Sequence, residues 1–210
     1  MNSELPQLLA RRLLEPLLDC ATRARLAPTL SYGRHFGPPA HDARNAAVIL
    51  LLYPQNGQWR LPLTVRPQTM LVHAGQISLP GGVVEPGESS RDAALRELDE
   101  ELGISPRDVV VAGQLSPLYV FASNFLVTPW VASLATSPHM RPNPEEVDEV
   151  LEVPLEHLVN PANFGKHLHH YGELSFTAPH FRFGEHVIWG ATSMILSELV
   201  AMAEPLRNDR

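Results

Sequence analysis

Three glutamates in the stretch RELDEELG, residues 96–103, have the types and the spacing that a cation site requires. In a helix, Glu97, Glu100 and Glu101 lie side by side, because residues three and four apart are neighbours on the helix surface. Like charges at this spacing repel by about 0.2–0.5 kcal/mol per pair. The stretch is therefore either a solvated acidic face or a site where a bound cation offsets the repulsion.

The surrounding residues favour the cation site. Between positions 85 and 101 there are seven acidic residues and only two arginines, so little in this segment neutralises the negative charge. Just upstream, Gly81 and Gly82 lack side chains and allow backbone carbonyls to approach a ligand closely. Mg²⁺ binds carboxylate and carbonyl oxygens, commonly together with substrate phosphates. These residues predict a divalent metal site.

A helix is expected to position the glutamates. Ser89, with Asp92 three residues later, forms a capping pair that starts the helix, and Gly103 ends it. The apolar residues of the segment gather on one side, which predicts a buried face. These residues are Ala94, Leu95, Leu98 and Leu102. The three glutamates are expected on the opposite, exposed side.

The spacing of these residues resembles the Nudix box. Gly82 and Glu88 are separated by five residues, and seven more residues precede RELDEELGI, so every fixed position of G-x5-E-x7-R-E-U-x-E-E-x-G-U is matched, U being aliphatic. The resemblance implies an α/β fold, a Nudix-type α/β/α sandwich with a mixed sheet. It also implies an enzyme, a pyrophosphohydrolase that holds Mg²⁺ or Mn²⁺ and hydrolyses a nucleoside diphosphate linked to another moiety.

The resemblance also implies roles for individual residues. The expected metal ligands are Glu97, Glu100, Glu101 and the carbonyl of Gly82. The expected catalytic residues are Glu97, Glu100 and Arg96, with Arg96 orienting the glutamates through a charge-assisted bond. Glu88 is expected to support the loop.

A carboxylate near the metal is expected to act as the general base. It would take the proton from a water whose pKa the metal lowers. Glu97 is the first choice, and Glu146 or Glu149 in the downstream acidic loop are the alternatives.

The segment LTVRPQTMLVHAGQISLPGG, upstream of the box, resembles the signature of coenzyme A pyrophosphatases. The resemblance extends from about residue 46 to residue 199, through FLVTPWVA, NPEEVDEVLEVPL and IWGAT. The implied function is hydrolysis of the diphosphate of coenzyme A or its derivatives, giving 3′,5′-ADP and 4′-phosphopantetheine-type products. The expected substrate-binding residues are Arg66, His73 and Gln76.

Three residues depart from this signature and keep other substrates open. Pro67 stands where serine or alanine is usual, Leu71 replaces an arginine, and Leu79 replaces phenylalanine. The change at Leu71 matters most, because arginine can bind phosphate with two hydrogen bonds and leucine cannot. The alternatives are hydrolysis of ADP-ribose, dinucleotides or nucleotide sugars, and a Nudix module that senses a nucleotide without cleaving it. The retained box glutamates argue against the sensor.

Residues 1–43 are expected to form an N-terminal helical extension and loop, and residues 44–204 the Nudix hydrolase domain. Leucines at helical spacing in residues 4–26 predict a helix, which Pro16 would kink or divide. AAVILLLY, QNGQ and WRLPLTVR predict a hairpin, with Pro62 at an edge or a bulge.

The C-terminal half is expected to supply further strands and helices. DVVVAGQLSPLYV and FLVTPWVASL read as strands, PNPEEVDEVLEVPLEHL begins as an acidic loop, and the end of the chain reads as a strand and a helix. HLHHY, residues 167–171, is a candidate transition-metal site. A solvated loop is the preferred interpretation, because no complementary Cys/His pair at ligand spacing accompanies it.

Composition limits the classes of partner. A formal net charge of -7 gives no general attraction for nucleic acids or anionic membranes, so a small-molecule nucleoside diphosphate derivative is the expected partner. A single cysteine is compatible with a reducing interior. We find no targeting signal or membrane span and expect a cytoplasmic location. The N-terminal helices and the apolar C-terminal segment could serve a homodimer or could equally cover one sheet.

Overall fold

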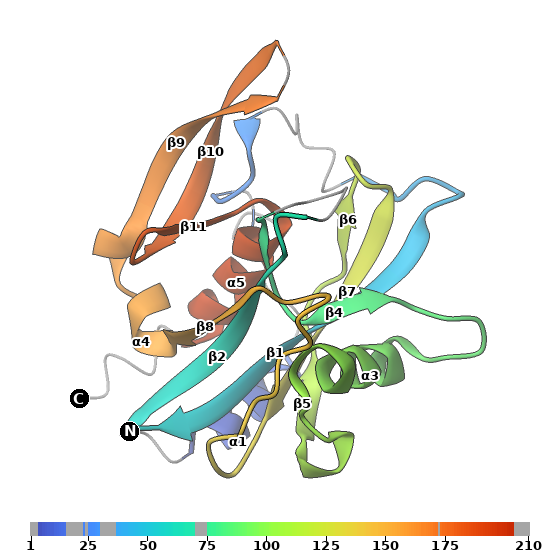
Figure 1. Cartoon of the computed structure of the whole chain (residues 1–210), viewed down its shortest axis with the longest axis vertical. Coiled ribbons are helices and arrows are strands. Elements are labelled where there is room, and N and C mark those ends of the chain that lie inside the picture. Colours follow the sequence, from blue (N-terminus) through green and yellow to red (C-terminus); the bar gives the residue numbers. More distant parts are fainter. Residues whose placement is uncertain are drawn as a thin grey trace.

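A computed structural model describes residues 4–15, 23, 25–29, 37–69, 75–171 and 173–203 (Figure 1). Its helices are α1 (Leu5–Arg12), α3 (Ser90–Leu102), α4 (Leu155–Leu158) and α5 (Gly190–Ala203), with 3₁₀ turns η3 (Pro106–Asp108) and η4 (Pro161–Asn163). The larger sheet contains β1 (Arg44–Gln55), β2 (Gln58–Val65), β3 (Ile77–Ser78), β4 (Gly81–Val83), β5 (Val110–Gln114), β6 (Leu118–Val120), β7 (Phe125–Ser133) and β8 (Glu149–Pro154). A second sheet contains β9 (Phe164–Tyr171), β10 (Leu174–Phe183) and β11 (His186–Trp189).

The larger sheet is mixed, as the sequence predicts. Its longest ladder is parallel and joins β1 to β7, from Arg44 opposite Phe125 to Leu52 opposite Ser133. The other ladders are antiparallel, with β2 and β4 pairing β1, β5 and β6 pairing β7, and β3 and β8 pairing β2. This pairing brings β4, which carries the paired glycines, alongside the start of β1.

The predicted hairpin is confirmed. Asn56 and Gly57 connect β1 to β2 with positive φ values of 51° and 74°, a conformation that asparagine and glycine tolerate better than other residues. The β1 ladder ends at Arg60, whereas the β8 ladder continues to Val65. Pro62 therefore lies beyond the β1 ladder, where its missing N–H interrupts no bond to β1.

Alternating residues of β1 build two cores, one on each face of the sheet. Ile49 and Leu51 pack with α3 on one face, whereas Leu50 and Leu52 pack on the other face with residues of α1 and α5. All four are at most 1% exposed, and full burial of such a side chain stabilises the fold by about 1.5–3 kcal/mol. Helices thus cover both faces of the sheet, which confirms the α/β/α sandwich (Figure 1).

The N-terminal helix shares the main core. Leu5 and Leu9 of α1 are buried in the same cluster as α5. The predicted kink at Pro16 lies outside the described residues. The C-terminal prediction is confirmed, because β11 leads directly into α5, whose apolar residues are almost all buried.

The expected solvated loop at residues 167–171 is wrong. These residues belong to β9, which pairs antiparallel with β10 from Phe164 opposite Phe181 to Tyr171 opposite Leu174. Pairing with a strand that follows in the chain overrides the polar local composition, which alone favours a loop. In the described part of the chain, no helix is long and apolar enough to cross a membrane.

A buried ion pair joins the N-terminal segment to α5. Arg23 is 4% exposed and Glu198 is 1% exposed, and their side chains are in direct contact. Ser116 donates to Glu198 Oε1 from its backbone N at 3.1 Å and its hydroxyl at 2.9 Å, and Arg23 also donates to the carbonyl of Pro117. Burial lowers the pKa of Arg23, and the charge of Glu198 opposes that effect.

Glu198→Ala is expected to lower the free energy of unfolding by about 3–5 kcal/mol, because it leaves the Arg23 charge buried and unpaired. Urea denaturation followed by circular dichroism measures the loss. Glu185→Ala, in the exposed turn after β10, is the matched control and should stay within about 0.5 kcal/mol of the parent. Equal losses in the two variants would contradict the assignment.

Candidate metal and active site

Helix α3 begins and ends where the sequence predicts. The Ser89 hydroxyl accepts from the backbone N of Asp92 at 3.1 Å. Gly103 has a φ of 65° and donates its N–H to the carbonyl of Asp99 at 2.8 Å. The helix buries Ala94, Leu98 and Leu102 against β1. This packing fixes the rotation of the helix and hence the direction of its glutamates.

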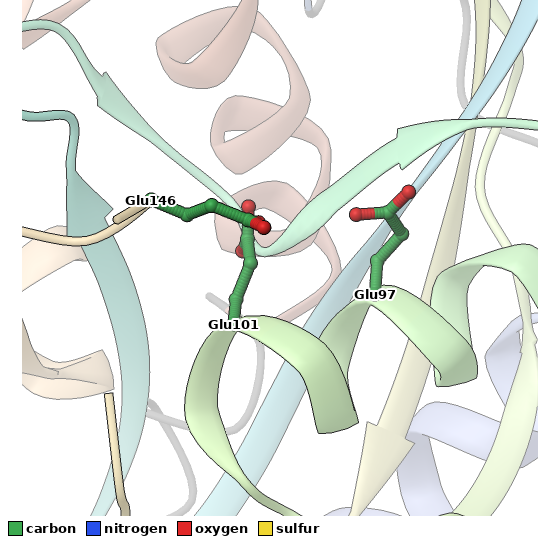
Figure 2. Close-up of side chains that lie close together, drawn as sticks. All are labelled: Glu97, Glu101 and Glu146. Atoms are coloured by element: carbon green, nitrogen blue, oxygen red, sulfur yellow. The ribbon is translucent and has the colours of Figure 1, made fainter. Parts of the chain in front are cut away.

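Three carboxylates converge beside the C-terminal half of α3. Glu97 and Glu101 project from the helix, and Glu146 reaches toward them from the loop between β7 and β8 (Figure 2). One oxygen from each lies within 4.8 Å of one oxygen from the other two. We call these three residues the carboxylate cluster. It could hold a divalent cation, because carboxylates are the ligands that Mg²⁺ and Mn²⁺ prefer.

Glu101 is buried, which corrects the expectation that all three helix glutamates are exposed. It is 3% exposed, because β4 and the loop that carries Glu146 cover its side of the helix. Its burial, followed by the charges of Glu97 and Glu146, raises its pKa to about 8. A backbone hydrogen bond from Gly81 and the charge of Arg66 oppose this increase. Glu101 therefore favours its protonated form unless a cation lies nearby.

The carboxylate cluster offers oxygen atoms that suit a hard cation. Oε2 of Glu101 is buried and has no hydrogen-bond partner among the described residues, so it is free to act as a ligand. Glu97 is half-buried, and burial is the largest cause that raises its pKa. The backbone of Gly82 lies directly against the Glu97 carboxylate, where a Cβ at Gly82 would overlap the carboxylate atoms. Only glycine permits this approach, which places the Gly82 backbone beside the cluster.

Arg96 binds a second group of acidic side chains, which shares Glu97 with the carboxylate cluster. Its Nη1 donates to Glu97 Oε1 at 2.9 Å and to Glu100 Oε2 at 2.8 Å, and its Nε donates to Glu88 Oε1 at 3.0 Å. Its Nη2 donates to the carbonyl of Val83 at 3.1 Å. The hydrogen bond to Glu88 is the largest cause that raises the pKa of Arg96. Arg96 thus orients Glu97, whereas Glu100 lies on the exposed side of Arg96 and outside the carboxylate cluster.

The expected substrate-binding residues are only partly described. The backbone N of Arg66 donates to the carbonyl of Gln76 at 3.0 Å, and the N of Gly75 donates to the carbonyl of Arg66 at 3.1 Å. Arg66 is close enough to the cluster to act on the pKa of Glu101, and its buried Nε has no hydrogen-bond partner among the described residues. Gln76 is exposed. His73 and Leu71 lie outside the described residues.

The loop with Glu146 is tied to the C-terminal end of α3. The N–H of Arg141 donates to the carbonyl of Leu102 at 2.8 Å, and the N–H of Asn143 donates to the carbonyl of Glu101 at 2.9 Å. At the other end of the loop, the N–H of Asp148 donates to the carbonyl of Val65 at 2.8 Å. These bonds position the loop over both α3 and β2.

The sequence reasoning missed Asn143. Its side-chain Nδ2 donates to Glu146 Oε1 at 3.4 Å, and its carbonyl accepts from the N–H groups of Glu146 and Val147. An asparagine followed by proline is a turn signal that could have singled it out. Glu149, the other base candidate, is exposed at the start of β8, with an oxygen 3.5 Å from Nε2 of His186.

Comparison with known proteins identifies the family. The model described as NUDIX domain matches residues 43–173, which is more than half of the chain. The chain belongs to the Nudix family and is a pyrophosphohydrolase of the Nudix hydrolase type.

Named relatives include coenzyme A diphosphatases. The chain is 35% identical over 166 residues to the mitochondrial coenzyme A diphosphatase NUDT8 of Homo sapiens. The aligned region covers 77% of this chain and 70% of that protein. It is 36% identical over 167 residues to the uncharacterized Nudix hydrolase NudL of Photorhabdus laumondii, covering 77% and 86% of the two chains. These matches support a coenzyme A pyrophosphatase-like family.

Solved structures agree with the fold. A MutT/nudix family protein from Enterococcus faecalis aligns with a TM-score of 0.53 and 16% identity, over 89% of this chain and 73% of that chain. The Nudix hydrolase RenU from M. Smegmatis aligns with a TM-score of 0.51 and 18% identity, over 80% and 85%. At these identities the likeness concerns the fold alone.

The stability of the metal-free protein is expected to fall as the pH rises from about 4.5 to 8. In this range the unfolded chain ionises Glu101 while the native state still holds its proton, so ionisation favours unfolding. Below this range both states are protonated, and above it the loss is complete, on the order of 5 kcal/mol at most. Melting temperatures of the parent and Glu101→Gln, measured with a chelator across this range, isolate the contribution.

Glutamine cannot ionise, so the melting temperature of Glu101→Gln should rise relative to that of the parent as the pH increases. Adding Mg²⁺ should raise the melting temperature of the parent at high pH and have little effect on the variant. If the melting temperatures of the two proteins changed with pH in parallel, the ionisation of Glu101 would not be the cause of the loss of stability.

Proposed function

We propose that this protein hydrolyses the diphosphate bond of coenzyme A or its derivatives, giving 3′,5′-ADP and 4′-phosphopantetheine-type products. The observation that best supports metal-dependent hydrolysis of a diphosphate is the carboxylate cluster beside the paired glycines. The coenzyme A diphosphatase relatives at about 35% identity support the substrate class. The upstream residues Arg66 and Gln76 belong to the matching signature and lie next to each other through backbone pairing.

In this proposal the cluster binds Mg²⁺ or Mn²⁺ through Glu97, Glu101 and Glu146, together with the carbonyl of Gly82. The cation, when bound, neutralises the diphosphate charge and lowers the pKa of a bound water. Arg66 supplies a guanidinium for a substrate phosphate, because its Nε has no hydrogen-bond partner in the described part of the chain. Glu100 remains a proposed metal ligand, although it lies outside the carboxylate cluster and its Oε2 accepts a hydrogen bond from Arg96.

Glu97 is our proposed general base. Arg96 fixes one of its oxygens, which leaves the other directed away from the guanidinium. Its half-buried position and raised pKa bring its proton affinity closer to that of an effective base near neutral pH. Glu146 is the alternative, because its loop brings a carboxylate to the same place.

The two base candidates can be separated by kinetics. Glu97→Gln is expected to lower kcat by at least about 100-fold at saturating metal, because the amide cannot accept the proton and positioned bases typically contribute about 10²–10⁴-fold. Glu146→Gln should mainly weaken metal binding, so that added Mg²⁺ restores much of its activity. The reverse pattern would assign the base to Glu146.

One observation favours a second class of substrate. Leu71 stands where the coenzyme A signature has arginine, which favours ADP-ribose, dinucleotides or nucleotide sugars. A nucleotide sensor without activity has less support, because the box glutamates are retained and two of them lie in the cluster.

The remaining parts of the proposal concern organisation and location. We assign the catalytic domain to residues 44–204 and regard residues 1–43 as an extension, of which α1 packs on the core. We propose a cytoplasmic location, and a homodimer stays a prediction. The relatives include mitochondrial and peroxisomal proteins, so location differs among them.

The function is tested by offering coenzyme A, ADP-ribose, NADH and a nucleotide sugar separately, with Mg²⁺ or Mn²⁺, and identifying products by mass spectrometry. Coenzyme A should be cleaved preferentially, to products with masses of 3′,5′-ADP and phosphopantetheine. Glu101→Gln should lower turnover by at least about 100-fold and serves as the background control. Preferential cleavage of ADP-ribose, NADH or the sugar would instead support the second class, and no cleavage would support the sensor.

A further inference from the structure

Three histidines share one face of the smaller sheet, away from the carboxylate cluster. His167 and His169 are two residues apart on β9 and therefore point to the same face. His167 lies opposite Ala178 of β10, and His180 lies opposite Gly165 of β9, so His180 is on that same face. In Figure 1, β9 and β10 extend away from the larger sheet.

Two of the imidazoles are hydrogen-bonded to each other. Nδ1 of His167 is 3.0 Å from Nδ1 of His180. A tetrahedral Zn²⁺ bound to both Nδ1 atoms at about 2.0–2.1 Å would hold them about 3.3 Å apart, so the cation would replace the proton of this hydrogen bond. The ring of His169 is 5.9 Å from that of His167, between centroids, within reach of a side-chain rotation.

The burial of His180 fixes the position of its ring beside His167. Its side chain is 1% exposed, and its Nε2 has no hydrogen-bond partner among the described residues. The ring lies directly over Gly165, where a Cβ would be 2.6 Å from Nε2, so the sheet holds the imidazole in place only because that position is glycine. Nδ1 is thereby directed toward His167, whereas Nε2 faces the backbone of β9.

The protonation state of the three histidines suits a metal. Burial is the largest cause that lowers the pKa of each, and neighbouring positive charges lower them further, including Arg182 for His180. The imidazoles are therefore neutral at pH 7, which is the form that binds metals. Trp189 stacks on His169 with ring centroids 4.2 Å apart, so His169 would have to rotate out of this contact to join the other two histidines.

We propose that β9 and β10 bind a transition-metal cation of the Zn²⁺ class through His167 and His180, with His169 as the third ligand. Imidazole nitrogens select Zn²⁺, Cu²⁺ and Ni²⁺ over Mg²⁺, so this site differs in chemistry from the carboxylate cluster. The structure also removes both reasons for rejecting a metal here, because residues 167–171 form a strand and β10 supplies the complementary histidine. The cation would cross-link the edge strand β9 to β10.

Cu²⁺ is the probe that tests this site, because its electron paramagnetic resonance spectrum distinguishes nitrogen from oxygen ligands. One equivalent is added to the full chain in excess Mg²⁺, which occupies the carboxylate cluster. We expect a spectrum with hyperfine splitting from at least two nitrogens. His167→Gln, at a half-buried position, should weaken Cu²⁺ binding by at least about tenfold and remove the multiple-nitrogen pattern.

His170→Gln is the matched control, because His170 lies on the same strand but on the opposite face, exposed and bonded to the Ser175 hydroxyl. It should bind Cu²⁺ like the parent. Zn²⁺ should also raise the melting temperature of the parent and of His170→Gln but not that of His167→Gln, with circular dichroism confirming that each variant is folded. A spectrum of oxygen ligands, a spectrum unchanged by His167→Gln, or equal weakening in both variants would overturn the proposal. None of these outcomes depends on the hydrolytic activity.

Discussion

The mutual repulsion of three carboxylates, one of them buried, is the constraint on which the rest of the site depends. Glu101 is held against Glu97 and Glu146 although burial and both charges disfavour its ionised form. Such an arrangement persists only where the surrounding fold over-determines it. Here the apolar face of α3, the cap at Ser89 and the left-handed Gly103 fix the helix, so Glu97 and Glu101 project toward the loop that carries Glu146.

Arginines divide the acidic residues into two functional sets. Arg96 binds Glu88, Glu97 and Glu100 with short hydrogen bonds, whereas Glu101 and Glu146 form no ion pair within the described part of the chain. Arg66 acts on Glu101 only as a neighbouring charge. The guanidinium of Arg96 therefore orients side chains at the edge of the site, and the carboxylate cluster remains available for a cation and a diphosphate. Glu97 belongs to both sets and connects them.

Local features of the site were predictable from the sequence, whereas contacts between distant segments were not. The cap, the end of α3, the hairpin turn and the mixed sandwich follow from residue chemistry and a motif with fixed spacing. The burial of Glu101 depends on a loop some forty residues downstream, which no periodicity reports. The same holds for β9, because its polar residues form a strand only when β10 pairs with them. Asn143 has a turn signal, but its role depends on the carbonyl of Glu101, which only the fold brings near.

The attachment of the Glu146 loop to α3 has a consequence for the dynamics of the site. Carbonyls at the end of a helix lack partners within the helix, and here the N–H groups of Arg141 and Asn143 satisfy two of them. The loop thus ends the helix, and the last helical turn in return orders the loop. Fraying of that turn would release Glu146 and loosen Glu101 in the same event. The positions of Glu101 and Glu146 are therefore coupled through these two bonds, and a cation that binds both carboxylates would stabilise the end of the helix as well.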